Sequence, residues 1–238
     1  MGDVDALKKA AALAALELIP NNAVVGLGSG STLQYFIQEL GVRVRSGQLY
    51  VVGVPTSYQS HFLAQESGVP LLDPMSVDSV DITVDGADEI DPAGNLIKGG
   101  GGAHVMEKLV AAMAKQFVIV ADETKPVQVL GAQTAVPVEV ITPALAFVMK
   151  KVREFGGQPQ IRSSNGKLGP VISDLGHPIL DVKFAAITDA VQLNHQLNAI
   201  PGIVGHGLFV GMADQALIAR APRENPVVET RVLKRIAL

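Results

Sequence analysis

The sequence contains no cysteine and no tryptophan, and it has only 3 tyrosines and 7 phenylalanines among 238 residues. The absence of cysteine excludes disulfide bonds, zinc–thiolate sites and a cysteine nucleophile. It is also typical of proteins from a reducing compartment. We therefore expect a cytoplasmic protein.

Long runs of one charge and long apolar runs are also missing. The net charge is -4, and no cluster of lysine and arginine provides the basic surface that nucleic acids require. The apolar stretches end before the length of about 18 to 20 residues that spans a bilayer. Residues 1–20 lack the basic start and continuous apolar core of a signal peptide. We expect neither a nucleic acid nor a membrane as partner.

The first half of the chain alternates short apolar strands with segments of helical spacing. This order predicts an α/β fold, with a Rossmann-like, mostly parallel sheet whose strand C-termini form the natural ligand site. We expect strands at 23–27, 49–54, 80–84 and 117–121 and helices at 3–19, 33–40, 57–66 and 103–115, with Asp3 or Asp5 as the first N-cap.

The pattern changes after about Gly131, where shorter elements surround a Gly/Ser/Asn-rich stretch. This predicts an inserted smaller α+β domain of the ferredoxin-like kind. We expect strands at 138–141, near Gln160, at 171–174 and at 179–182, helices at 143–155 and 189–197, a broken apolar run at 203–210, and a strand at 215–219 that returns to the first sheet. The expected domains are 1–131 plus 207–238 and 132–206.

A glycine-rich segment, GLGSGST at 26–32, stands between an expected strand and an expected helix. Glycines let a backbone approach an anion closely, and the amides of a helix start can donate to phosphate oxygens. The dinucleotide fingerprint requires a third glycine where Ser31 stands, and no Gly-Lys-Ser/Thr of a P-loop is present. Taken alone, the segment is equally consistent with a phosphate cradle and with a structural turn.

Two further motifs follow. DGADEID at 85–91 comes directly after an apolar strand, where α/β enzymes place catalytic carboxylates, although an exposed acidic turn would look the same. KGGGGAHVME at 98–107 places four glycines between Lys98 and a helix, which costs backbone entropy and favours an oxyanion loop over a linker. Glu107 then lies in the first helical turn, where it can reach a ligand or simply complement the helix dipole.

The three motifs together, in this order, resemble the A-type ribose-5-phosphate isomerase family, and the DGADEID and KGGG pair is the most specific part. The resemblance covers essentially the whole chain and also includes the Leu7-Lys8-Lys9 helix, VADETK ending at Lys125, PVEVI at 137–141 and NAIPG at 198–202. Ser29 stands where threonine is usual, and GAH at 102–104 where Gly-Ala-Ala is familiar. Neither departure alters the spacing from Lys98 to Glu107.

The resemblance implies an isomerase that interconverts ribose 5-phosphate and ribulose 5-phosphate in the non-oxidative pentose phosphate pathway. It implies no cofactor, no metal and a homodimer or homotetramer. The implied catalytic residues are Glu107 as the proton acceptor, with Asp85, Asp88 and Lys98. The implied substrate-binding residues are Lys8, Ser29, Gly30, Ser31, Thr32, Asp85, Gly86, Ala87, Asp88, Lys98, Gly99, Gly100, Gly101 and Lys125.

The chemistry explains these residue types. Aldose–ketose isomerisation moves a proton between neighbouring carbons, so one carboxylate can serve both steps, and the enediolate oxygen needs fixed donors. Two alternatives stay open: coenzyme A transferases and sugar-phosphate deaminases share such a sheet with a helix-borne glutamate, and a sugar-phosphate-sensing protein would keep the phosphate loops. The sensing protein would not need Glu107 and usually carries a DNA-binding domain, which no segment here resembles.

Overall fold

The computed structural model describes residues 2–166, 168–222 and 224–235. The chain divides into two compact units, one comprising Met1–Ala87, Met106–Lys125 and Gly211–Leu238 and the other Asp88–Val105 and Pro126–Val210. Residues 88–105, 126–131 and 207–210, which we expected in the first domain, belong to the second unit. No helix in the described part of the chain is long and apolar enough to cross a membrane.

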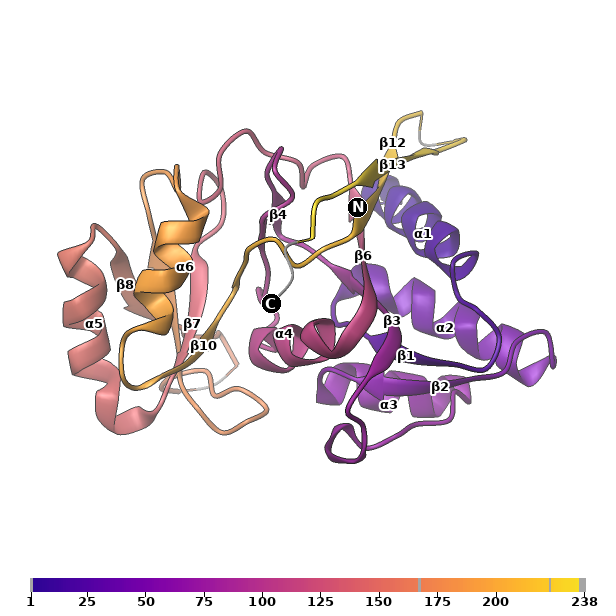
Figure 1. The fold of residues 1–238 in the computed structure, drawn as a ribbon, viewed down its shortest axis with the longest axis horizontal. Coiled ribbons are helices and arrows are strands. Elements are labelled where there is room, and N and C mark those ends of the chain that lie inside the picture. The colour runs from indigo at the N-terminus through magenta and orange to yellow at the C-terminus, as the bar shows by residue number, and fades with distance from the viewer. Residues whose placement is uncertain (1, 167, 223, 236–238) are drawn as a thin grey trace. The chain divides into compact units, whose positions relative to one another are not determined.

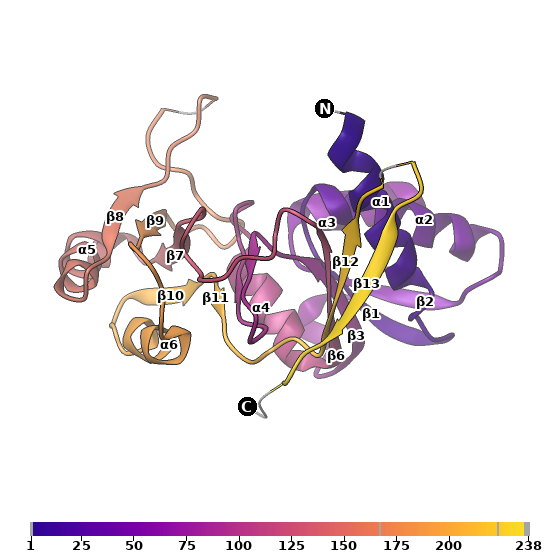
Figure 2. The ribbon, with the colours of Figure 1, turned by 90° about the horizontal axis from the view of Figure 1, so that it is seen from above.

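The first unit is built on a six-stranded sheet in the order β13-β12-β6-β3-β1-β2 (Figure 1). All its pairings are parallel except that of β12 with β13, which lie side by side at one edge (Figure 2). The strands are β1 (Ala23–Leu27), β2 (Val51–Pro55), β3 (Val80–Gly86), β6 (Ala114–Asp122), β12 (Gln215–Arg220) and β13 (Val227–Val232). The helices are α1 (Gly2–Leu16), α2 (Ser31–Arg45), α3 (Tyr58–Ser67), the 3-10 helix η1 (Pro74–Ser76) and α4 (His104–Met113), whose first residues belong to the second unit.

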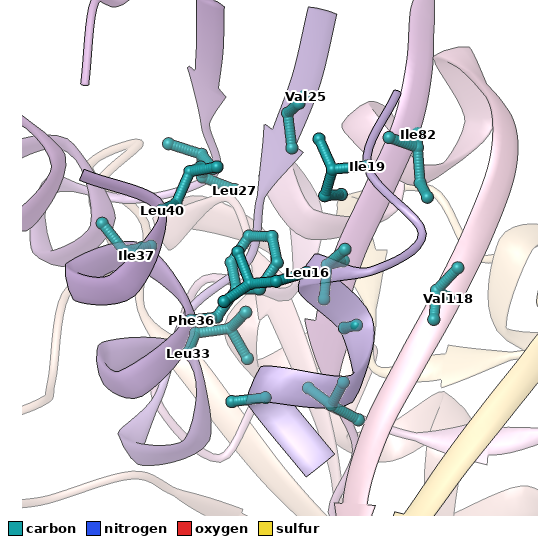
Figure 3. Close-up of a cluster of buried hydrophobic side chains, with 14 of the residues drawn as sticks. Leu16, Ile19, Val25, Leu27, Leu33, Phe36, Ile37, Leu40, Ile82 and Val118 are labelled. Carbon is teal, nitrogen blue, oxygen red and sulfur yellow. The ribbon is translucent and has the colours of Figure 1, made fainter. Parts of the chain in front are cut away.

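The strands of this sheet carry apolar side chains on both faces, and helices pack against them. Val25 and Leu27 of β1 pack into a core with Leu16 of α1 and Phe36 of α2 (Figure 3). On the other face, Val110 of α4 packs with residues of the strands. The two covered faces explain why the parallel strands read as almost continuous apolar runs in the sequence.

The second unit contains a ferredoxin-like fold and a small three-stranded sheet. The fold runs β7 (Val136–Val140), η2 (Thr142–Ala144), α5 (Leu145–Glu154), β8 (Gln158–Ile161), β9 (Ile179–Lys183), α6 (Ala190–Asn198) and β10 (Ile203–His206), in the antiparallel order β10-β7-β9-β8. The small antiparallel sheet joins β4 (Glu89–Ile90), β5 (Leu96–Ile97) and β11 (Leu208–Phe209). Both parts of the fold class expected from the sequence are therefore confirmed.

Several local expectations were wrong. Residues 171–174 form no strand, because a turn closed by Gly176 follows Ser173, and only the Ile172–Pro178 bridge remains. The first helix begins at Gly2, so Asp3 and Asp5 lie inside it and do not cap it. It also ends at Leu16 rather than at residue 19.

Other differences concern the bounds of α4 and β6 and three strands that the sequence pattern did not predict. Residues 114 and 115 belong to β6 and not to α4, because this strand is longer than its apolar centre. The tail forms a second strand, β13, whose mixed and largely exposed side chains are typical of a sheet edge. The two-residue strands β4 and β5 are too short to show any periodicity.

Candidate active site

The glycine-rich loop follows β1 at the point where the strand order of the parallel sheet reverses. The strand β1 lies between β2 and β3, so residues 28–32 lie at the strand C-termini beside the switch point, where parallel sheets of this kind bind their ligands. Gly28 donates its N–H to the Val84 carbonyl at 2.9 Å, which holds the loop against β3. A Cβ at Gly28 would lie 2.3 Å from Asp85 Oδ1, so only glycine allows this approach.

Asp85 lies near the end of β3 and is completely buried. Its Oδ1 accepts the backbone N–H of Ser29 at 3.2 Å and that of Gly86 at 2.7 Å. The carboxylate therefore fixes the first part of the glycine-rich loop and the turn toward Ala87. Burial without such bonds would be costly for a charged group, and charge-assisted bonds of this kind are among the stronger ones.

The start of α2 carries the features of an anion site. Gly30 has a φ of 105° and directs the chain into the helix, whose first residues are Ser31 and Thr32. The first amides of a helix have no acceptor within the helix, and the first turn of α2 contains no acidic residue. The positive end of the helix dipole and the two hydroxyl groups therefore favour a bound phosphate here.

A group of hydroxyl side chains links this loop to the end of β2, and the sequence pattern did not predict these contacts. Ser29 Oγ lies 2.9 Å from Thr56 Oγ1 and 2.6 Å from Ser57 Oγ. Gln59 Oε1 accepts the Gly30 N–H at 3.0 Å. The sequence did offer one sign, because Thr56 and Ser57 directly follow an expected parallel strand, and α/β proteins place ligand-binding residues at such strand ends. Ser29 thus stabilises the loop through its hydroxyl group.

Glu107 lies in the first turn of α4 and is only 4% exposed. The next residue, Lys108, is half-buried, and burial lowers the pKa of its ammonium group to about 7. On the sheet side of the helix, Thr83 Oγ1 of β3 donates to the Val110 carbonyl at 3.3 Å. The helix that carries Glu107 is therefore tied to the strand that carries Asp85.

Two of the expected site residues, Lys125 and Lys8, lie outside the three motifs. Lys125 ends a turn after β6 in which the buried Asp122 carboxylate accepts the Thr124 N–H at 2.9 Å and the Lys125 N–H donates to the Asp122 carbonyl at 3.2 Å. Lys125 and Asp85 therefore both lie at the C-terminal ends of the parallel strands. Lys8 lies on α1, where its Nζ is 3.5 Å from Asp5 Oδ1 and forms an ion pair within the helix.

The second unit brings together Asp88, Lys98 and the glycine loop. The N–H of Gly100 donates to Asp88 Oδ2 at 2.9 Å, and the N–H of Lys98 donates to the Gly207 carbonyl at 2.8 Å. Lys98 is 2% exposed, and its Nζ lies 5.5 Å from the centre of the Phe209 ring, a cation–π contact. The ammonium group is thus held in a largely desolvated position.

The expected site residues therefore fall into two groups, one in each unit. The first holds residues 28–32, Asp85, Glu107 and Lys125, and the second holds Asp88 and residues 98–101. Among the described residues, no group of three or more His, Cys, Asp or Glu side chains could hold a metal ion.

A glycine-rich helix start at the switch point of a parallel sheet, with carboxylates beside it, defines an α/β enzyme that binds phosphorylated metabolites. Comparison with known proteins identifies the family. The model of the family described as ribose 5-phosphate isomerase A (phosphoriboisomerase A) matches residues 52–222. The chain belongs to the ribose 5-phosphate isomerase A family.

Relatives and solved structures agree with this result. The ribose-5-phosphate isomerase A of Trichormus variabilis is 47% identical over 94% of this chain and 96% of its own length, and that of Methanothermobacter thermautotrophicus is 51% identical over 89% and 92%. The structure of the Methanocaldococcus jannaschii enzyme superimposes with a TM-score of 0.89 at 42% identity, covering 95% of this chain and 98% of that one. A D-ribose-5-phosphate isomerase in complex with phospho-erythronic acid also gives 0.89, at 41% identity over 94% and 98%. The family resemblance and the isomerase class expected from the sequence are confirmed.

Proposed function

We propose that this chain interconverts D-ribose 5-phosphate and D-ribulose 5-phosphate through an enediolate, with Glu107 as the base and without a metal. The observation that carries the proposal is the loop at 28–32, held against the buried Asp85 in a member of this family. Because the chain belongs to this family, isomerisation is favoured over a coenzyme A transferase or deaminase reaction. It is also favoured over a role in sensing sugar phosphates.

The phosphate group binds at the start of α2, where the backbone amides and the hydroxyl groups of Ser31 and Thr32 donate to its oxygens. Lys125, with Lys8 as a further candidate, adds positive charge. These contacts are the same in the ground state and the transition state, so they orient the sugar without lowering the barrier by themselves.

Glu107 takes the proton from the carbon beside the carbonyl and returns it to the neighbouring carbon. Its position in the first turn of α4, with only 4% of the residue exposed, suits this role, because a general base must be held in a defined place beside the carbon that it deprotonates. The same group serves as base and then as acid, so no second proton carrier is needed between the two carbons.

Removal of the proton leaves negative charge on the enediolate oxygen. The desolvated ammonium group of Lys98 and the amides of Gly99 and Gly101 stabilise that charge, while the bond from the Gly100 N–H to Asp88 holds the loop in place, which limits reorganisation during the reaction. Asp85, Asp88 or both transfer the protons that open the sugar ring, while Gly86 and Ala87 line the turn between them.

Phospho-erythronic acid, which is bound in one relative, is expected to bind this chain as well. Its carboxylate carries one negative charge shared by two oxygens, as the enediolate carries negative charge on oxygen, so the two should use the same donors. The acid therefore reports on the oxyanion donors, whereas inorganic phosphate reports on the helix start alone. Binding of both can be measured by calorimetry.

The test is a coupled assay with ribose 5-phosphate in the presence of EDTA. We expect full turnover after exhaustive chelation, because Lys98 and backbone amides take the place of a Lewis acid. In heavy water the product gains deuterium at the carbon that receives the proton, since a carboxylic acid can exchange with solvent. Activity lost in EDTA and restored by a divalent metal contradicts the metal-free mechanism, and transfer without solvent deuterium contradicts Glu107 as a solvent-exchanging base.

We also infer a cytoplasmic enzyme that forms a homodimer or homotetramer. The location rests on the absence of cysteine. The assembly rests on the family resemblance and is tested by light scattering.

A further inference from the structure

Arg162 lies just after β8 and connects two parts of the second unit that are distant in sequence. Its Nε is 3.1 Å and 3.0 Å from the two carboxylate oxygens of Asp181 on β9, and its Nη2 also donates to this carboxylate. Its Nη1 donates to the carbonyls of Gly99 at 3.2 Å and Gly100 at 3.1 Å. The Arg162 side chain is only 14% exposed, whereas that of Asp181 is 33% exposed and Gly100 lies at the surface.

One peptide group of the glycine loop is held at both ends. In a trans peptide the carbonyl and the N–H point in opposite directions. The Gly99 carbonyl accepts from Arg162, and the N–H of the same peptide, that of Gly100, donates to Asp88 Oδ2. A cation on the oxygen and a carboxylate on the N–H fix the plane of this peptide.

The next peptide group is held at its oxygen. The Gly100 carbonyl accepts from Arg162, so the N–H of Gly101 points away from the guanidinium group. Gly101 is exposed, and in the described chain a Cβ built there would meet no atom within 4 Å. A cation on the carbonyl of a peptide also polarises its N–H, which makes that N–H a stronger donor.

We infer that Arg162, oriented by Asp181, is a positioning residue that directs and strengthens the Gly101 N–H as a donor to the developing oxyanion. The inference rests on the proposed function, because it assigns the glycine loop to the enediolate. Arg162 contacts the loop through the carbonyls of Gly99 and Gly100, so we assign it an indirect role. The bidentate contact with Asp181 and the two carbonyls require the planar fork of arginine, so a lysine cannot replace it.

The test compares Arg162→Met and Arg162→Lys with the wild-type enzyme and with Arg153→Met, a matched control that removes an exposed arginine of α5. Both Arg162 variants should lower kcat by about 10- to 100-fold, since small misplacements of catalytic groups have effects of this size. The KM for ribose 5-phosphate and the Kd for inorganic phosphate should stay within about twofold, because the helix start is intact. Binding of phospho-erythronic acid should weaken by about tenfold, because it uses the oxyanion donors.

A second readout is chemical rescue. Guanidinium ion, added to Arg162→Ala far below denaturing concentrations, should restore part of kcat, whereas methylammonium should not, because it lacks the planar fork. A folded Arg162→Met with kcat within about threefold of Arg153→Met overturns the inference, as does equal weakening of phosphate and phospho-erythronic acid binding. If Arg162→Met does not fold, Arg162→Lys is judged by the same limits. Failure of the wild-type enzyme to isomerise ribose 5-phosphate refutes the proposed function instead.

Discussion

Replacement of Gly28 by alanine tests whether the contact between the glycine-rich loop and Asp85 organises the site. The added Cβ would lie 2.3 Å from Asp85 Oδ1 and 2.7 Å from Asp85 Cα. The carboxylate is fully buried and accepts the amides of Ser29 and Gly86, so it cannot turn aside without losing these bonds. The loop must therefore move away from β3.

The expected size follows from these contacts. Forcing extra volume into a packed region costs about 1–3 kcal/mol. Loss of one hydrogen bond to the charged carboxylate adds about 1.5–3 kcal/mol. We therefore expect the free energy of unfolding to fall by about 3 kcal/mol or more. Because the same movement displaces the phosphate-binding amides, kcat/KM should fall by about 100-fold.

The assays are urea unfolding followed by circular dichroism and the coupled isomerase assay. Gly166→Ala is the control, because a Cβ there meets no described atom within 4 Å. It should leave the free energy of unfolding within about 0.5 kcal/mol of the wild-type value. A Gly28→Ala enzyme with full activity and a loss below about 1 kcal/mol would show that the loop does not depend on its contact with Asp85.

Three further outcomes are expected. Lys98→Ala should lower kcat, since the ammonium group meets developing charge; an unchanged kcat would remove Lys98 from the mechanism. Ser31→Ala and Thr32→Ala should mainly raise KM, since the phosphate charge is constant; an equal loss in kcat would contradict this division. Lys108 has a folded pKa of about 7, below its ordinary value of 10.5, so the unfolded chain binds more protons between these values and stability should rise with pH across that window. Lys108→Met should flatten this rise in urea unfolding midpoints, and an unchanged slope would contradict the lowered pKa.

Local sequence patterns predicted most of the first unit because its elements are repetitive and its strands are buried on both faces. The glycine-rich loop around Gly28 and the place of Asp85 near the end of a strand could also be predicted from the sequence. The residues that these groups contact could not. That Thr56 and Ser57 lie beside Ser29 depends on β1 and β2 being neighbours, which no local periodicity encodes.

Arg162 shows the same limit more strongly. It lies in a Gly/Ser/Asn-rich stretch that reads as a loop, and its partners are Asp181 and the carbonyls of Gly99 and Gly100, which are far away in the sequence. Backbone carbonyls leave no trace in a sequence pattern. The edge strand β13 was missed for a different reason, because its residues are exposed or only partly buried and mix apolar with charged side chains.

The central claim is that Glu107 carries the proton, and Glu107→Gln tests it most directly. The substitution nearly preserves the shape of the buried side chain but removes the base. We expect turnover of ribose 5-phosphate to fall by at least about 10²- to 10⁴-fold, while calorimetry shows that phospho-erythronic acid and inorganic phosphate still bind. A folded Glu107→Gln enzyme that keeps more than about a tenth of wild-type turnover would contradict the account, and Asp85 and Asp88 would be the next residues to test as the base.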